Sequence, residues 1–263
     1  MEKQFEWNPV QGERGILTGC DENQEWMLKW WWEHYRQHNH LPVTFFDFGL
    51  SQSARRWCEK RGKTVSVDLP PTLVKQKKCF PKKVQKQWEK LYSLELWRAR
   101  KGWLSKPFAF LLSTYKYAVW MDVDCQVRRP LDPLFATPLG KDGLAATREV
   151  QRAVDHARRC GALLPEEKAY NTGVIFFRHG APVMTKWAEN TYHRSDQFMG
   201  DGEVFNRTLL ENHFEPNELS AVYNRHVRDG VTPDTVIVHY VCSGGKHLIL
   251  KSLTTSHPKK SLN

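Results

Sequence analysis

The chain has 263 residues and a formal net charge of +10 at pH 7. This length suits one α/β domain with a sizeable core, and no linker rich in Pro, Gly and Ser divides it. No apolar stretch approaches the roughly 20 residues that span a bilayer, and the first residues lack the apolar core of a signal peptide, so we expect a cytoplasmic protein. The six cysteines form no C-x-x-C pair, which favours reduced thiols over disulfides or a zinc site.

The positive charge is concentrated in one segment. Between Lys75 and Lys106, eleven Lys and Arg residues stand against two Glu residues, an excess that accounts for nearly all of the net charge. Aromatic residues are interleaved with these cations. The segment is either a solvated helix face with its tryptophans turned to the core, or a surface for an anionic membrane or acceptor. Nucleic acid is not expected as a partner, because the charge lies in one helical region away from the acidic strand ends.

The first part of the chain alternates strands and helices. We expect strands at 15–20, 43–48 and 64–67, and helices at 26–35 and 54–61. Asp21, with Gln24 three residues later, resembles a capping box at the start of the first helix. Alternation of this kind is typical of parallel sheets.

The remaining elements continue the pattern with less regularity. The apolar spacing predicts a helix at 82–100 and another at 108–113, which follows Pro107. Later elements are strands at 117–121, 144–147, 174–177 and 235–240, and helices at 182–192 and 202–210. Residues 254–263 are polar and basic without periodicity, so we expect a flexible tail after a domain at 1–253.

Two carboxylates follow the strand at 117–121. That strand is apolar on both faces, as a central parallel strand should be, and it leads directly into Asp122-Val123-Asp124. Ligand sites in open α/β sheets lie at such carboxyl ends, and buried carboxylates need a partner cation. Asp-x-Asp by itself is common by chance. A divalent ion with hard oxygen ligands, Mn²⁺ or Mg²⁺, fits this position, with His239 after another apolar strand as a candidate imidazole ligand.

The order of the motifs resembles the glycogenin-like, family 8 glycosyltransferases of the GT-A fold. The motifs, which span about residues 14 to 250, are Leu17 to Asn23, Lys106-Pro107, Trp120 to Asp124, Tyr170 to Val174, Gly200 to Asn206, and Val238-His239-Tyr240. The resemblance implies a mostly parallel Rossmann-like sheet flanked by helices, with a small antiparallel addition near the active site.

The resemblance also implies site residues. Asp122, Asp124 and His239 match the metal ligands, which implies Mn²⁺ or Mg²⁺ as the cofactor. Asp201 and Glu203 match the two acids at the start of the acceptor-side helix, where they orient the acceptor. Positions that match nucleotide-sugar contacts are Thr18, Gly19, Asp21, Asn23, Lys106, Asp122, Val123, Asn171, Thr172 and Gly173.

Two positions depart from the family pattern. The family has Asp-Gln-Asp where this chain has Asp201-Gly202-Glu203, so the amide expected beneath the reacting sugar carbon is absent, and Gln197 is a candidate substitute. The glycines and lysine that grip the diphosphate come late after His239, which makes Lys246 the candidate phosphate ligand.

The implied activity is metal-dependent transfer of a hexose from a UDP-sugar to a hydroxyl of a glycan or lipid-linked glycan, with retention of the anomeric configuration. The basic segment 75–106 would then contact the inner membrane face. A haloacid-dehalogenase-type phosphohydrolase also places Asp-x-Asp after an apolar strand, and Gly200-Asp201 resembles its later motif. A non-catalytic protein that binds a sugar nucleotide or an anionic surface is the remaining alternative.

Overall fold

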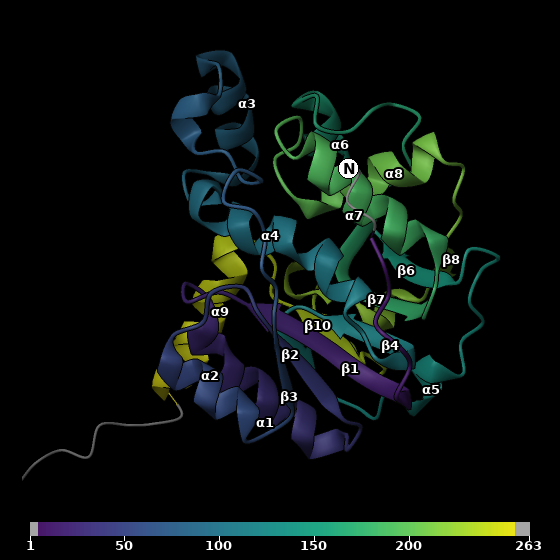
Figure 1. The fold of residues 1–263 in the computed structure, drawn as a ribbon. Coiled ribbons are helices and arrows are strands. Elements are labelled where there is room, and N and C mark those ends of the chain that lie inside the picture. Colours follow the sequence, from purple (N-terminus) through teal and green to yellow (C-terminus); the bar gives the residue numbers. More distant parts are fainter. Residues whose placement is uncertain (1–4, 256–263) are drawn as a thin grey trace, which may run out of the picture.

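A computed structural model describes residues 5–255, and in this part of the chain the fold is a seven-stranded sheet with helices on both faces and a second sheet of three strands (Figure 1). The strands are β1 Gly12–Cys20, β2 Val43–Asp47, β3 Lys63–Ser66, β4 Tyr115–Met121, β5 Cys125–Val127, β6 Leu144–Arg148, β7 Tyr170–Arg178, β8 Asn217–Leu219, β9 Arg225–His226 and β10 Ile237–His239. The helices are α1 Leu28–His38, α2 Gln52–Glu59, α3 Lys82–Tyr92, α4 Leu96–Leu111, α5 Asp132–Phe135, α6 Gln151–Arg159, α7 Pro182–Arg194, α8 Asp201–Glu211 and α9 Cys242–Thr255. Short 3₁₀ turns are η1 Glu25–Met27, η2 Lys77–Cys79, η3 Ala221–Tyr223 and η4 Val227–Asp229.

The large sheet has the order β3-β2-β1-β4-β7-β6-β8. All neighbouring strands pair in parallel except β7, which runs antiparallel to both β4 and β6. Met121, at the end of β4, pairs with Val174 in the middle of β7, so residues 170–173 extend past the end of β4. The reversal of β7 brings residues 170–173 to the edge of the sheet where β1 and β4 end. This is the edge at which open α/β sheets bind ligands.

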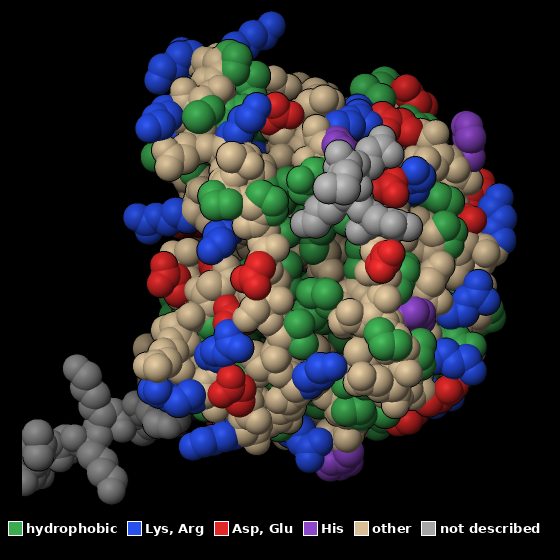
Figure 2. Space-filling view, in the orientation of Figure 1, with side chains coloured by type: hydrophobic (Ala, Val, Ile, Leu, Met, Phe, Trp, Pro, Cys, Tyr) green, Lys and Arg blue, Asp and Glu red, His purple; other side chains and the backbone are tan. Residues whose placement is uncertain are grey.

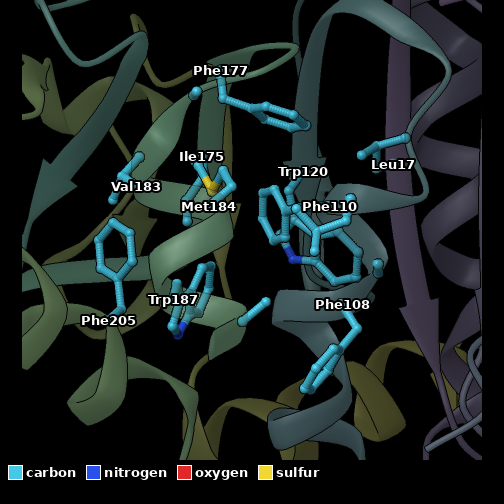
Figure 3. Close-up of a cluster of buried hydrophobic side chains, with 14 of the residues drawn as sticks. Leu17, Phe108, Phe110, Trp120, Ile175, Phe177, Val183, Met184, Trp187 and Phe205 are labelled. Atoms are coloured by element: carbon cyan, nitrogen blue, oxygen red, sulfur yellow. The ribbon is translucent and has the colours of Figure 1, made fainter. Parts of the chain in front are cut away.

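The two faces of the sheet are covered by different helices. Trp120 and Ile175 belong to a core cluster with α4, α7 and α8, whereas their neighbours Val119 and Phe176 belong to a cluster with α1. Side chains alternate between the faces of a strand, so the consecutive apolar residues 117–121 of β4 and 174–177 of β7 supply both layers. Figure 3 shows the first cluster, in which aromatic rings from α4, β4 and α7 pack together. Burial of such large side chains stabilises the fold by about 1.5–3 kcal/mol each.

The predicted mostly parallel α/β fold is confirmed, and the small sheet differs in one respect from the expected antiparallel addition. In the order β5-β10-β9, β10 is antiparallel to β5 but parallel to β9. This sheet is therefore mixed. In this sheet Cys125 on β5 pairs with His239 on β10, which places the chain just after Asp124 beside His239.

Five helices differ from the sequence prediction, and two of them, α5 and α6, were absent from it. The helix expected at 82–100 is two helices, α3 and α4, and Ser93 between them has a φ of 76°. Pro107 lies inside α4 instead of before a new helix, and buried neighbours such as Leu104 and Phe108 keep that helix packed through the proline. The sequence analysis did not predict α9, whose Gly244 and Gly245 are weak helix formers. Because α9 continues to Thr255, two residues of the expected tail are helical, and residues 256–263 lie outside the described part.

The cations of the basic segment do not share one surface. Lys82, Lys83 and Lys86 are exposed on α3, and Figure 2 shows Lys and Arg side chains gathered there, whereas Arg100 and Lys106 are buried in α4. Trp88 is buried within a small aromatic cluster with Phe80. The tryptophan of α3 therefore faces the core, and the exposed lysines of this helix face outward, as both interpretations of the basic segment require.

Within residues 5–255, no helix is both long and apolar enough to cross a membrane.

Candidate active site

The predicted metal carboxylates lie at the junction of the two sheets, each paired with a lysine. Asp122 follows β4, and its backbone N–H donates to the carbonyl of Gly173 on β7 at 2.9 Å. Lys106, from α4, places its Nζ 2.9 Å from Asp122 Oδ1 and 2.8 Å from Asp201 Oδ2. Burial opposes the charged form of Lys106, but the carboxylates of Asp122 and Asp201 outweigh it and raise the pKa of this ammonium. Lys106 therefore joins β4 to the start of α8.

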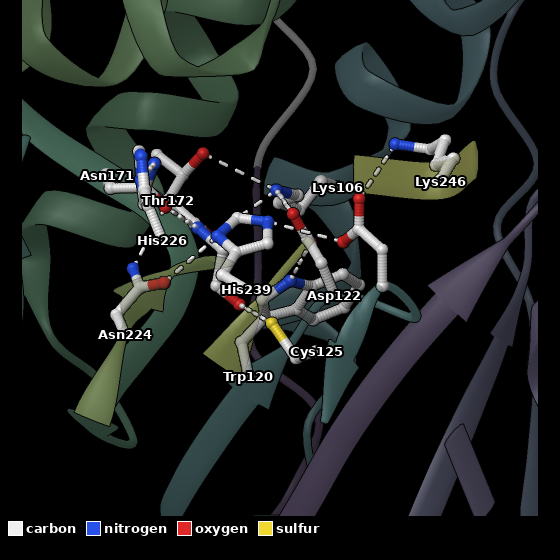
Figure 4. Close-up of polar contacts among 12 residues, drawn as sticks. Lys106, Trp120, Asp122, Cys125, Asn171, Thr172, Asn224, His226, His239 and Lys246 are labelled. Atoms are coloured by element: carbon white, nitrogen blue, oxygen red, sulfur yellow. Dashed lines mark hydrogen bonds and ion pairs between the residues drawn. The ribbon is translucent and has the colours of Figure 1, made fainter. Parts of the chain in front are cut away.

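Asp124 has two cationic or imidazole neighbours. Lys246 Nζ lies 2.7 Å from its Oδ2, and His239 Nε2 lies 3.3 Å from its Oδ1. Burial raises the pKa of Asp124, but Lys246 and His239 outweigh burial, so the pKa lies below its ordinary value. Lys246 lies on the first turns of α9. The structure thus brings together four of the predicted residues, Asp122, Asp124, His239 and Lys246 (Figure 4).

A chain of amide hydrogen bonds determines which nitrogen of His239 carries a proton. The backbone N–H of Gly173 donates to Asn171 Oδ1 at 2.9 Å, which identifies that atom as an oxygen acceptor. Asn224 Nδ2 donates to the same oxygen at 2.9 Å, so Asn224 Oδ1 is the atom that faces His239 Nδ1, also at 2.9 Å. His239 Nδ1 must therefore be the donor. A neutral His239 consequently presents an unprotonated Nε2 to Asp124.

This arrangement fits a divalent metal. An unprotonated Nε2 and a carboxylate oxygen are both acceptors, and they lie only 3.3 Å apart in His239 and Asp124. Two facing acceptors need a cation between them, or a proton on the ring. Metal-binding histidines commonly donate their second ring N–H to an oxygen acceptor, as His239 does to Asn224. Carboxylate oxygens and an imidazole nitrogen are ligands that Mn²⁺ accepts.

Gly173 and Cys125 surround His239. A Cβ at Gly173 would lie 2.2 Å from His239 Cε1, so the absence of a side chain there lets the imidazole pack against β7. Cys125 Sγ lies within 4.8 Å of the ligand atoms of Asp124 and His239. Burial raises the pKa of the Cys125 thiol well above its ordinary value, so this sulfur stays protonated and is a poor ligand.

The start of α8 places Asp201 and Glu203 beside the metal carboxylates. Thr172 Oγ1 donates to Asp201 Oδ2 at 2.8 Å. Glu203 Oε2 accepts from the backbone N–H groups of Met199 at 2.6 Å and Gly200 at 3.1 Å, so this acid also caps the helix. Burial raises the pKa of Glu203 to about 7. The two acids therefore differ: Asp201 pairs with a lysine, whereas Glu203 holds a proton near neutral pH.

Two cavities meet at the carboxylates. The smaller, of about 40 Å³, is lined by Gly19, Asp21, Val123 and Lys106, and burial raises the pKa of Asp21. The larger, of about 890 Å³, is lined by residues that include Asn171, Thr172, Asp201 and Glu203. Asp122, Asp124, Lys246 and Trp103 line both. Gly19, Asp21 and Val123 thus lie at the smaller cavity, whereas the expected acceptor residues share the larger one with Asn171 and Thr172, which the resemblance assigned to the donor sugar.

Four predicted residues lie outside both cavities, and one of them, Gly173, packs against His239. Thr18 is inside β1, with a buried hydroxyl that makes no hydrogen bond with any residue from 5 to 255. Asn23 is exposed and donates to Asp21 Oδ2 at 3.1 Å, so it orients Asp21. Gln197 is exposed because the next residue, Phe198, turns into the core, and Gln197 Oε1 accepts from Arg194 instead. The structure does not bring Gln197 to the site.

The sequence analysis missed the residues that surround Asn171. Asn171 Nδ2 donates to Glu149 Oε2 at 2.8 Å, and His226 Nε2 lies 3.4 Å from Glu149 Oε1. Burial lowers the pKa of His226. Asn171 therefore supports His239 and Glu149 in this structure, although the resemblance implied a contact with the donor sugar. Glu149, Asn224 and His226 belong to no sequence motif. Glu149 follows β6, His226 ends β9, and Asn224 lies in the turn before β9, so the fold alone brings them to the site.

Comparisons with solved structures identify the fold. The galactosyltransferase LgtC, solved with donor and acceptor sugar analogues, matches with a TM-score of 0.61 and 15% identity over 93% of this chain and 98% of that one. The chain has the GT-A fold. The glycosyltransferase GlyE of Streptococcus pneumoniae matches at 0.55 and 16% identity, covering 88% of this chain and 55% of that one. Mouse xyloside xylosyltransferase 1 matches at 0.51 and 14% identity, covering 88% and 97%.

The predicted resemblance to the glycogenin-like, family 8 enzymes is confirmed as a match in fold across most of this GT-A chain. No family model matches the sequence, and no curated protein matches it. Identity near 15% supports the fold only. The reaction must be argued from the site itself.

Proposed function

We propose that this protein is a metal-dependent glycosyltransferase that moves a hexose from a UDP-sugar to a hydroxyl of a glycan or lipid-linked glycan, with retention of the anomeric configuration. The observation that carries the proposal is the pairing of Asp124 with His239, whose Nδ1 donates to Asn224 so that Nε2 faces the carboxylate, between two cavities. The larger cavity has room for a sugar nucleotide and an acceptor, whereas the smaller one would take only a part of the nucleotide beside the carboxylates. The GT-A fold supports the same interpretation.

Asp122, Asp124 and His239 would hold Mn²⁺ or Mg²⁺. The ion would supply Lewis-acid stabilisation of the charge that develops on the leaving diphosphate. Lys106 and Lys246 add fixed positive charge beside the same carboxylates, so the diphosphate would meet cations as it departs. The buried position of Lys106 strengthens this effect, because charges interact more strongly away from water.

The acids of α8 would act on the acceptor. Asp201 is held by Lys106 and Thr172, which gives its carboxylate one orientation beside the larger cavity. Glu203 lines the same cavity, and its raised pKa allows it to accept or release a proton near neutral pH. These residues would orient the attacking hydroxyl and exclude bulk water from the far side of the sugar.

The structure does not support the phosphohydrolase alternative at its second motif, Gly200-Asp201. That interpretation needs Gly200-Asp201 to follow a strand, but in this structure it follows α7 and begins α8. A non-catalytic binding protein has the same site without turnover, so only an activity measurement separates it from an enzyme.

The decisive measurement is UDP release from UDP-glucose, UDP-galactose and related donors, with and without Mn²⁺. Release that requires Mn²⁺ is expected. Asp124→Asn should lower it by about 10²-fold or more, the size of effect seen when a charge-stabilising group is lost from an active site. The matched control is Asp68→Asn, an exposed acid with the same change of charge, which should retain wild-type rates. Absence of UDP release with every donor, or an active Asp124→Asn enzyme with a wild-type fold, would contradict the proposal.

We also propose that α3 contacts an anionic membrane at the cytoplasmic face. Lys82, Lys83 and Lys86 are exposed on this helix, and Leu94 in the following turn is 65% exposed. Exposed cations beside an apolar side chain suit the headgroup region of an anionic bilayer.

A further inference from the structure

The larger cavity extends well beyond the metal carboxylates, and its outer wall is α6. At the end of α6, Gln87 on α3 donates to the carbonyl of Cys160, and His156 Nε2 lies 3.3 Å from the carbonyl of Lys90. At the start of α6, Arg152 pairs with Asp229 of η4. Helix α6 is thus tied to α3 at one end and to η4 at the other. Residues from all three elements line the cavity.

The acids that line this cavity all have partners within the protein. Asp122, Asp124 and Asp201 pair with Lys106 or Lys246, and Glu203 accepts backbone N–H groups. Away from the carboxylates, Glu89 accepts from Lys77 and Trp97, and Glu149 accepts from Val150 and Asn171. None of these acids is left to neutralise a further cation on the wall.

In contrast to these acids, three cations of the outer wall have no ion-pair partner among residues 5–255. These cations, Lys90, Arg159 and Arg228, line the cavity and are exposed. Lys90 and Arg159 lie near the α3–α6 contact, whereas Arg228 lies near the start of α6, with its Nη2 only 2.4 Å from the position of a Cβ at Gly244. These two places lie at opposite ends of α6, where Arg152 and Arg159 are seven residues, or roughly 10 Å of helix axis, apart.

We propose that the acceptor is an acidic oligosaccharide whose phosphate or carboxylate groups bind Lys90, Arg159 and Arg228. This proposal rests on the proposed function. Guanidinium and ammonium groups without internal partners are suited to such anions. Their separation along α6 requires an acceptor longer than one sugar. Tyr92 and Trp103, whose rings meet edge to face at 4.6 Å, line the same cavity and offer apolar surface to sugar rings.

The site also differs in place from the membrane contact. Lys82, Lys83 and Lys86 are on α3 but do not line the cavity, whereas Lys90 does. A glycan inside the cavity and a bilayer on the outer face of α3 therefore use different lysines. Variants of the two sets separate the two kinds of anionic partner.

The test is calorimetric titration of the whole protein, with UDP and Mn²⁺ present, by three defined oligosaccharides. Phosphomannopentaose carries phosphate, a hyaluronan tetrasaccharide carries carboxylates, and maltotetraose is neutral. At least one acidic probe is expected to bind about tenfold or more tightly than maltotetraose, and which one binds identifies the anion. Lys90→Gln/Arg159→Gln and Arg228→Gln should each weaken that probe about tenfold while changing maltotetraose less than about twofold.

The matched control is Lys82→Gln/Lys86→Gln, which removes the same charge outside the cavity and should leave the acidic probe within about twofold of wild type. Equal binding of maltotetraose, or equal loss in the control, would overturn the proposal. The proposal would also be overturned if Lys90→Gln/Arg159→Gln bound phosphatidylserine vesicles more weakly than wild type but bound the acidic probe equally well. Failure of this proposal can be told apart from failure of the proposed function. The titrations measure binding and need no turnover, whereas UDP release without an acceptor tests the proposed function and needs none of these three cations.

Discussion

At the scale of single residues, the site depends on amides that hold one imidazole. Asn171 and Asn224 carry no charge, yet together they assign the proton of His239 to Nδ1. The histidine was predicted from its place after an apolar strand. The amides were not, because Asn224 lies in a turn before β9 and its contact with His239 exists only after β10 has paired with β9.

Asn224→Ala should weaken Mn²⁺ binding by about ten- to hundredfold, the usual cost of losing a residue that orients a metal ligand. The physical reason is that His239 is then free to rotate or to adopt the other tautomer. Titration of bound Mn²⁺ by electron paramagnetic resonance measures the affinity directly.

Asn217→Ala is the control for this variant, because its amide donates to the carbonyl of Pro138 away from the site. Unchanged Mn²⁺ affinity in Asn224→Ala would show that the hydrogen bond to Nδ1 does not position His239.

A second residue prediction concerns pH. The pKa of Glu203 is raised to about 7 in the folded protein, from an ordinary value of 4.5, chiefly by burial. A raised folded pKa contributes stability below the unfolded pKa, and this contribution is lost as pH rises towards 7. Glu203→Gln lacks the titration, so its free energy of unfolding should gain on wild type by about 2–3 kcal/mol between pH 5 and pH 8.

Urea unfolding of both proteins at several pH values between 5 and 8 gives this difference. A constant difference between the two proteins across that range would show that Glu203 titrates as an ordinary exposed acid.

At the scale of elements, Arg100 connects the α3–α4 region to the approach to α8. Its guanidinium is buried and donates to the carbonyls of Ser195, Phe198 and Met199, while the rings of Phe80 and Trp88 lie against it. Burial lowers the pKa of Arg100 to about 10. The loop that it holds leads directly into Asp201.

Arg100→Lys should destabilise the protein by about 2–3 kcal/mol, because one ammonium cannot replace the planar group and leaves buried carbonyls without donors. Urea unfolding measures the loss. The control is Arg98→Lys, an exposed position of the same helix, which should stay within about 0.5 kcal/mol of wild type. Equal stability of the two variants would show that the loop does not depend on Arg100.

Elements were predictable where the pattern is local. Tyr117 to Met121 are apolar at successive positions, and such a run identifies a buried central strand without knowledge of its neighbours. Arg100 looked like one more exposed cation, because its acceptors lie almost a hundred residues further along the chain. Pro107 predicted a helix start, but packing of α4 against α7 outweighs the local preference of a proline.

At the scale of the whole molecule, charge is divided between two surfaces. Helix α3, with its exposed lysines, projects from one end of the fold (Figures 1 and 2), whereas the candidate metal carboxylates follow β4 at the junction of the sheets. The +10 net charge alone does not distinguish these places.

Sedimentation with phosphatidylserine vesicles tests the proposed membrane contact. The wild type should sediment in low salt and be released as salt rises, because surface attraction is screened. Removal of three charges in Lys82→Gln/Lys83→Gln/Lys86→Gln should weaken the vesicle affinity by more than about tenfold, at about 1 kcal/mol for each lysine. Neutral phosphatidylcholine vesicles are the control. Equal binding of the triple variant and wild type would exclude α3 as the contact.

The candidate metal ligands come from both sheets: Asp122 and Asp124 connect the end of β4 to β5, and His239 ends β10. The candidate phosphate ligand, Lys246, belongs to α9. An ion and a diphosphate bound there would tie together segments more than a hundred residues apart in the sequence. Ligands that bind only the folded chain add their binding free energy to its stability. The bound donor would therefore also hold these distant segments together. Protein with donor bound would resist unfolding and proteolysis longer than protein without it.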